Sequence, residues 1–129
     1  MPERLIIDAH HHYQNVPNYP DLLADEYARL GIAKVCLISP GGPDGIERLA
    51  EAVRRYPDLI LGLAQFDWEH HSPEDIDRFR DLGMAGVKFI RPPSPTTTRP
   101  FGRCTRAARS WACRGSFTWG SSVVPRAPA

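Results

Sequence analysis

Short apolar runs alternate along the chain with segments whose apolar residues recur at helical spacing. Four runs are apolar on both faces, as strands of a helix-covered parallel sheet are. They lie at residues 5–8, 33–39, 59–66 and 85–90. Each of the first three is followed by an amphipathic segment that predicts a helix. These segments cover residues 21–30, 44–56 and 73–82. The pattern predicts an α/β fold of four strand–helix units, the last without its helix.

Two architectures fit this repeat, an open doubly wound sheet and the N-terminal half of a (β/α)₈ barrel. No glycine-rich phosphate loop follows the first run, which disfavours a nucleotide-binding open sheet. Polar residues collect where the strands end, and both architectures bind ligands at that edge. These residues are His10, His12, Ser39, Gln65, Asp67, Lys88 and Arg91.

The first strand leads into Asp8 and three consecutive histidines. Because strand side chains alternate, we expect Asp8, His10 and His12 to share one face and His11 to take the other. Two imidazoles two residues apart can both reach one metal ion, and imidazole suits Zn, Fe, Ni or Cu. The alternative is that these histidines are structural or surface residues. A metal site would also need further ligands from elsewhere.

Two motifs resemble those of a known family. Residues 7–12 resemble the D-x-H-x-H signature on the first strand of the amidohydrolase superfamily, and Gly86–Phe89 is similar to the GVKF stretch of its amidohydrolase-related branch. That branch includes aminocarboxymuconate semialdehyde decarboxylase, other non-oxidative decarboxylases, and lactone and amide hydrolases. The resemblance covers residues 4–91, which is the N-terminal half of such a protein.

The resemblance implies a barrel that binds one divalent metal ion, usually Zn. His10 and His12 would be two of its four ligands, and Asp8 would support them without binding the metal. Lys88 is expected to be structural or to face the substrate. Arg91 is expected to hold a substrate carboxylate through a bidentate pair.

The composition changes abruptly near residue 92. Residues 1–90 carry all 15 acids and 9 bases, a net charge of −6, whereas residues 91–129 carry 7 arginines and no acid. No helical or strand period continues into this segment. We therefore expect residues 1–91 to be a truncated half barrel and residues 92–129 to be a non-native, disordered Arg/Pro-rich tail. Shifting the reading frame near codons 92–96 allows a fifth strand whose metal-binding histidine would stand at Thr118.

Several function classes are disfavoured by composition. A total charge of +1 argues against a nucleic-acid partner, and the arginine-rich tail lacks the lysine typical of such binders. No apolar run reaches the length of a membrane span. Three cysteines give no disulfide framework, so a cytoplasmic location is expected. His70 and His71 are expected to be solvent-exposed.

These observations predict a metal-dependent hydrolase or non-oxidative decarboxylase acting on a small carboxylated or cyclic substrate through metal-activated water. With two of four ligands, the present chain is expected to be an inactive, truncated form. The alternative is a non-catalytic α/β fragment that forms homo-oligomers through an open sheet edge.

Overall fold

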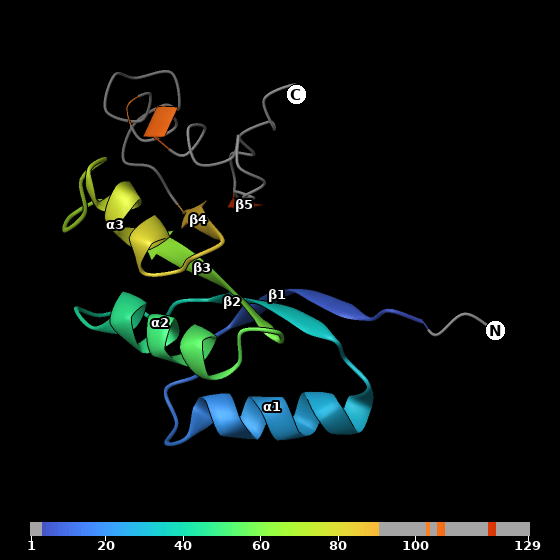
Figure 1. Cartoon of the computed structure of the whole chain (residues 1–129). Helices are drawn as coiled ribbons and strands as arrows, with labels where there is room; N and C mark the ends of the chain where they lie inside the picture. Colours follow the sequence, from blue (N-terminus) through green and yellow to red (C-terminus); the bar gives the residue numbers. More distant parts are fainter. Residues whose placement is uncertain (1–3, 91–102, 104–105, 108–118, 121–129) are drawn as a thin grey trace.

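The computed structural model describes residues 4–90, 103, 106–107 and 119–120 (Figure 1). Its sheet has the order β1-β2-β3-β4-β5, and all neighbouring strands are parallel. The elements in chain order are β1 (Ile7–His12), α1 (Tyr19–Leu30), β2 (Lys34–Ile38), α2 (Gly45–Arg55), β3 (Ile60–Phe66), α3 (Asp75–Asp81), β4 (Gly86–Phe89) and β5 (Trp119–Gly120). The predicted strand–helix repeat is confirmed.

The helices form where one apolar stripe can be buried. In α2, Ile46, Leu49 and Ala50 are buried, as their spacing predicted. Phe79 of α3 is fully buried. The three helices follow one another along the same side of the sheet (Figure 1). Within residues 4–90, none of them combines the length and apolar character needed to cross a bilayer.

The core therefore lies between the helices and the outer face of the sheet. Val35 and Leu37 of β2, Ala64 and Phe66 of β3, and Val87 of β4 all belong to it. The residues between them on each strand point to the opposite, inner face, which would line the interior of a closed barrel.

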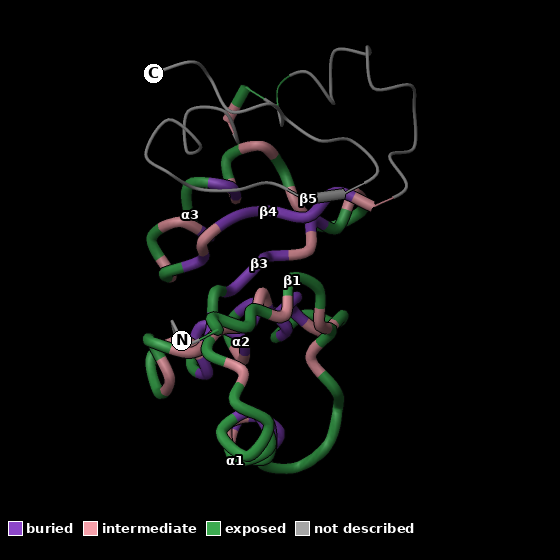
Figure 2. The backbone as a smooth tube through the Cα atoms, turned by 90° about the vertical axis from the view of Figure 1, so that its right-hand side faces the viewer, coloured by how far each residue is buried: buried purple, intermediate pink, exposed green. Residues whose placement is uncertain are grey.

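β1 is more exposed than the sequence predicted. Its first residue, Ile7, has an exposed fraction of 46%, and Leu5 and Ile6, directly before the strand, have 68% and 44%. Figure 2 shows this strand mostly exposed, in contrast to β3 and β4. The expectation of a buried strand was wrong because β1 is the edge of the described sheet, so burial there depends on a neighbour and not on composition.

An irregularity in β1 overturns the predicted alternation. Asp8 pairs with Val35 and His11 pairs with Leu37. An advance of three residues along β1 therefore corresponds to two residues along β2, so β1 contains one extra residue. Both partners face the helices. Asp8 therefore lies on the same face as His11, and the prediction that it shares a face with His10 and His12 was wrong.

Beyond residue 90, the structure places β5 parallel to β4, with Lys88 opposite Trp119. The sequence assigned no strand there, so β5 is a difference from that expectation. Its physical basis is that the edge of β4 offers backbone donors and acceptors to any extended segment. Arg91, Thr118 and most of the segment 92–129 lie outside the described residues, and the frameshift remains a prediction.

Candidate metal and substrate site

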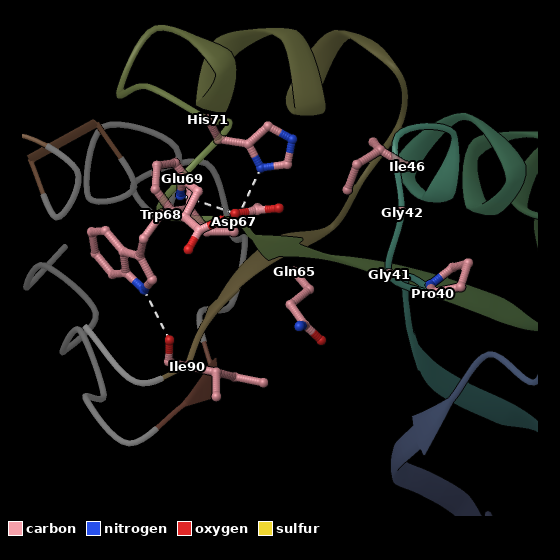
Figure 3. Close-up of a pocket in the computed structure, with 11 residues that line it drawn as sticks. Pro40, Gly41, Gly42, Ile46, Gln65, Asp67, Trp68, Glu69, His71 and Ile90 are labelled. Carbon is pink, nitrogen blue, oxygen red and sulfur yellow. Dashed lines mark hydrogen bonds between the residues drawn. The ribbon is translucent and has the colours of Figure 1, made fainter. Parts of the chain in front are cut away.

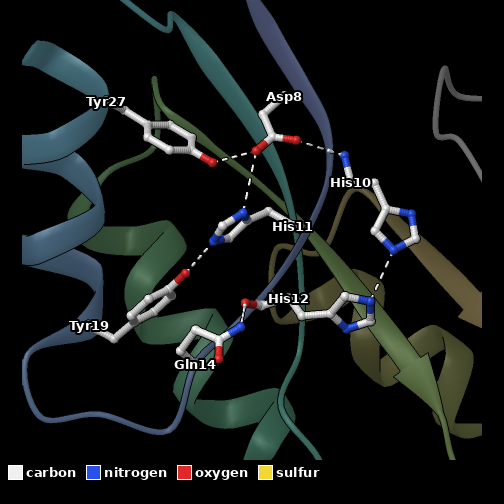
Figure 4. Close-up of polar contacts among 7 residues, drawn as sticks. All are labelled: Asp8, His10, His11, His12, Gln14, Tyr19 and Tyr27. Carbon is white, nitrogen blue, oxygen red and sulfur yellow. Dashed lines mark hydrogen bonds and ion pairs between the residues drawn. The ribbon is translucent and has the colours of Figure 1, made fainter. Parts of the chain in front are cut away.

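His10 and His12 bring their Nε2 atoms together near the C-terminal end of β1. The two atoms lie 3.0 Å apart, and the ring centroids are 5.0 Å apart (Figure 4). The register places His12 opposite Ile38, on the inner face of the sheet. The two imidazoles therefore lie side by side, and that they bind a metal ion stays a prediction.

Lys88 of β4 reaches the same point from across the sheet. Its Nζ lies 3.2 Å from Nε2 of His10, and its side chain is only 6% exposed. A buried ammonium is disfavoured, so burial lowers the pKa of Lys88. Partial desolvation and the charge of Lys88 also lower the pKa of His12. The neutral imidazole is the form that binds metal ions.

Asp8 lies on the other face, where it fixes β1 to α1. Its carboxylate accepts hydrogen bonds from the Tyr27 hydroxyl and from the backbone N–H of His10 at 3.1 Å. Nδ1 of His11 lies 3.4 Å from the same carboxylate, and Nε2 of His11 contacts the Tyr19 hydroxyl (Figure 4). Burial and the hydrogen bond to Asp8 raise the pKa of Tyr27 above its ordinary value. Asp8 thus positions the histidine strand through its backbone.

The donor set can be tested against the geometry of a zinc site. Two nitrogens bound at about 2.0–2.1 Å in a tetrahedral site lie roughly 3.3 Å apart. The 3.0 Å between the Nε2 atoms of His10 and His12 is close to that separation. No group of three or more His, Cys, Asp or Glu residues able to hold a metal occurs among the described residues. The two histidines therefore fit part of a zinc site.

A cavity of about 500 Å³ opens at the ends of β2, β3 and β4 (Figure 3). The loop after β2 contributes Gly41 and Gly42, and the end of β3 contributes Gln65, Asp67 and Trp68. Polar residues at these strand ends were noted in the sequence, but the cavity was not.

His71 also lines the cavity, in contrast to its predicted solvent exposure. It is half-buried, its ring centroid lies 5.0 Å from that of Phe79, and its Nδ1 accepts the backbone N–H of Asp67 at 2.9 Å. Burial lowers its pKa. Exposed His70 agrees with the prediction and pairs with Asp67 at 2.8 Å. The aromatic residues that flank the loop, Phe66 and Phe79, are the sequence signal that could have distinguished the two histidines.

Comparison with solved structures identifies the architecture. The chain is similar to a probable 2-pyrone-4,6-dicarboxylic acid hydrolase from Acinetobacter baumannii, with a TM-score of 0.68 and 15% identity over 91% of this chain and 49% of that chain. A predicted deoxyribose-phosphate aldolase from Coccidioides immitis matches with a TM-score of 0.57 and 17% identity, over 90% and 47% of the two chains. Both are (β/α)₈ barrels.

The chain spans about half the length of these solved structures. It therefore has the fold of part of a TIM barrel, which confirms the predicted architecture over the open doubly wound sheet. No family model matches the chain. No curated protein matches it either.

Proposed function

We propose that the chain is the N-terminal half of a metal-dependent hydrolase or non-oxidative decarboxylase that acts on a small carboxylated or cyclic substrate. The observation that carries the proposal is the convergence of His10 and His12 on one point beside buried Lys88. TIM-barrel enzymes place their active sites at this C-terminal end of the strands. The Acinetobacter baumannii neighbour is named as a hydrolase, which agrees with the proposed type of reaction.

In this proposal His10 and His12 hold one divalent ion, with Zn favoured by the imidazole donors. When bound, the ion would lower the pKa of a water molecule to about 7 and polarise a carbonyl or carboxylate. Lys88 then orients a substrate carboxylate from the inner face, because its ammonium group lies within 3.2 Å of His10. Arg91, predicted as a second carboxylate partner, lies outside the described residues.

Turnover is proposed for a complete barrel, because two histidines leave ligand positions unfilled. The present chain is thus expected to bind metal without catalysing a reaction. The strands of the described residues form an open sheet, which by itself does not exclude water from a reacting substrate.

The first experiment measures Zn²⁺ binding to the purified chain by calorimetry. We expect one ion per chain, with affinity reduced at least about tenfold by His10→Ala or His12→Ala, which corresponds to about 1.4 kcal/mol. His70→Ala is the matched control, because it removes an exposed imidazole from the loop between β3 and α3. Equal affinity in all three variants would refute the role of His10 and His12.

We propose a second candidate function on a separate observation. Ile7 begins the edge strand β1, and Leu5 and Ile6 directly precede it; all three are exposed, at an edge where backbone groups can accept another chain. The alternative is a non-catalytic fragment that forms homo-oligomers through β1. A concentration-independent monomer in sedimentation velocity, unchanged by Ile6→Lys, would exclude it.

A further inference from the structure

One residue that lines the cavity, Gln65, also belongs to the inner face of the sheet. Gln65 lies opposite Lys88 in the register of β3 and β4, and adjacent strands are about 4.8 Å apart. Gln65 is therefore the immediate neighbour of the lysine that contacts His10. In Figure 3 its side-chain amide extends into the space between Ile90 and Pro40.

The wall of the cavity is partly aromatic. Trp68 is half-buried, and its indole N–H donates to the carbonyl of Ile90 at 2.8 Å. Its ring packs at 4.9 Å from Phe66 and at 5.6 Å from Phe89, measured between centroids. This N–H already has an acceptor, so Trp68 contributes mainly apolar ring surface to the lining of the cavity. Flat groups with few polar atoms suit such a wall.

Among the described residues, the carboxylates that line the cavity are those of Asp67 and Glu69, and no lysine or arginine of that part of the chain lines it. Asp67 is kept ionised because its Oδ2 lies 2.8 Å from Nδ1 of His70 and its Oδ1 accepts the backbone N–H of Glu69 at 2.9 Å. His71 adds no reliable positive charge, because its Nδ1 is occupied by the N–H of Asp67. A carboxylate that enters this space meets like charge.

We infer that this cavity receives the end of the substrate remote from the reacting group, and that it accepts a flat uncharged or cationic group and rejects a second carboxylate. The inference rests on the proposed function, in which the reacting carboxylate lies at His10, His12 and Lys88. Gln65 is the residue that bridges the two parts, since its amide both donates and accepts hydrogen bonds. The substrate then carries its carboxylate at one end only.

Three aromatic acids of equal ring size test this selectivity. They are benzoate, 3-(aminomethyl)benzoate and benzene-1,3-dicarboxylate, which share the benzoate ring and carry no, a positive or a negative charge on the substituent at the remote position. Two like charges about 4 Å apart repel by about 1 kcal/mol even in water, which is roughly fivefold in affinity. We therefore expect 3-(aminomethyl)benzoate to bind at least about fivefold more tightly than the dicarboxylate, with benzoate between them.

Binding is followed in the whole chain by the ¹H–¹⁵N signal of the Trp68 indole, identified by its loss in Trp68→Phe. Glu69→Gln, an exposed loop substitution, is expected to reduce the affinity ratio about twofold or more. Gln65→Leu is expected to weaken both charged ligands several-fold while the ratio persists. Asp25→Asn on α1 makes the same charge change as Glu69→Gln away from the cavity and should leave the ratio unchanged.

The measurements use protein treated with a chelator, so that this inference and the proposed function can fail separately. Loss of the zinc result with the ligand preference intact would refute the metal site alone. A dicarboxylate that binds as tightly as the aminomethyl acid would refute the inference about the cavity. Absence of any ligand-dependent shift of the Trp68 signal would refute it as well.

Discussion

The first residue of α2, Gly45, allows a sharp test of the backbone packing that positions the wall of the cavity. Gly45 is buried at the first position of α2, and its N–H contacts the carbonyl of Gly42 at 3.4 Å. A Cβ atom on Gly45 would lie 2.0 Å from the carbonyl oxygen of Pro40 and 3.0 Å from its carbonyl carbon. Both Pro40 and Gly42 line the cavity. Gly45→Ala must therefore displace backbone that forms the wall.

The change in the free energy of unfolding caused by Gly45→Ala is the balance of two opposing effects. A 2.0 Å contact is more than about 1 Å shorter than an ordinary carbon–oxygen contact, and overpacking of this kind costs about 1–3 kcal/mol. Alanine is the better helix former by up to about 1 kcal/mol, an advantage that is smaller at the first helical position. We expect Gly45→Ala to lower the free energy of unfolding by about 1–2 kcal/mol.

Gly41→Ala is the control from the same loop. A Cβ atom there would meet nothing within 4 Å, and Gly41 has no positive φ. Its expected effect is neutral or stabilising by about 0.4–1 kcal/mol, through a less flexible unfolded chain. Urea unfolding followed by far-ultraviolet circular dichroism measures both variants, with stability taken from the midpoint at constant slope. Equal midpoints for the two variants would refute the reasoning.

The remaining predictions concern contacts between helices and strands. Phe79→Ala, at a fully buried site, is expected to lower stability by about 3–5 kcal/mol, as measured by urea unfolding. Tyr27→Phe removes the hydroxyl that donates to Asp8 and should lower stability by about 1–2 kcal/mol in the same assay. The hydrogen bond from the Tyr56 hydroxyl is the main reason why the pKa of Asp21 is lowered in the folded chain. The ionised carboxylate of Asp21 therefore stabilises the fold above its unfolded pKa, and this stabilisation is lost as the pH falls through its folded pKa. Tyr56→Phe should therefore move acid unfolding to higher pH, and an unchanged midpoint would contradict this.

The repeat of strands and helices was predictable because its signal is local. The apolar stripe of α2, formed by Ile46, Leu49 and Ala50, can be recognised from a few consecutive helical turns, and such a stripe is expected to be buried. The end of α1 was equally legible, since Gly31 adopts a φ of 71° that glycine readily tolerates. The burial of β1 was not predictable, because it depends on whether another strand lies beside Leu5 and Ile7.

The two histidines of the candidate site could be identified from the sequence, and the residues that contact and position them could not. His10 and His12 were identified from their residue type and spacing, which the irregular register did not disturb. Asp8 was assigned to the wrong face because alternation assumes an unbroken ladder, and one extra residue in β1 reverses it. The position of Lys88 beside His10 depends on a contact between residues 78 positions apart, which no local pattern encodes.

The order of the strands has a consequence for how the chain folds. Each of β2, β3 and β4 pairs with the strand before it, through residues about 25 positions apart. Every pairing thus closes a loop of similar and modest length, and none waits for a distant partner. A chain emerging from the ribosome can add one strand–helix unit after another to the sheet that already exists. The histidines of β1 would be in place before the strand that carries Lys88 has been synthesised.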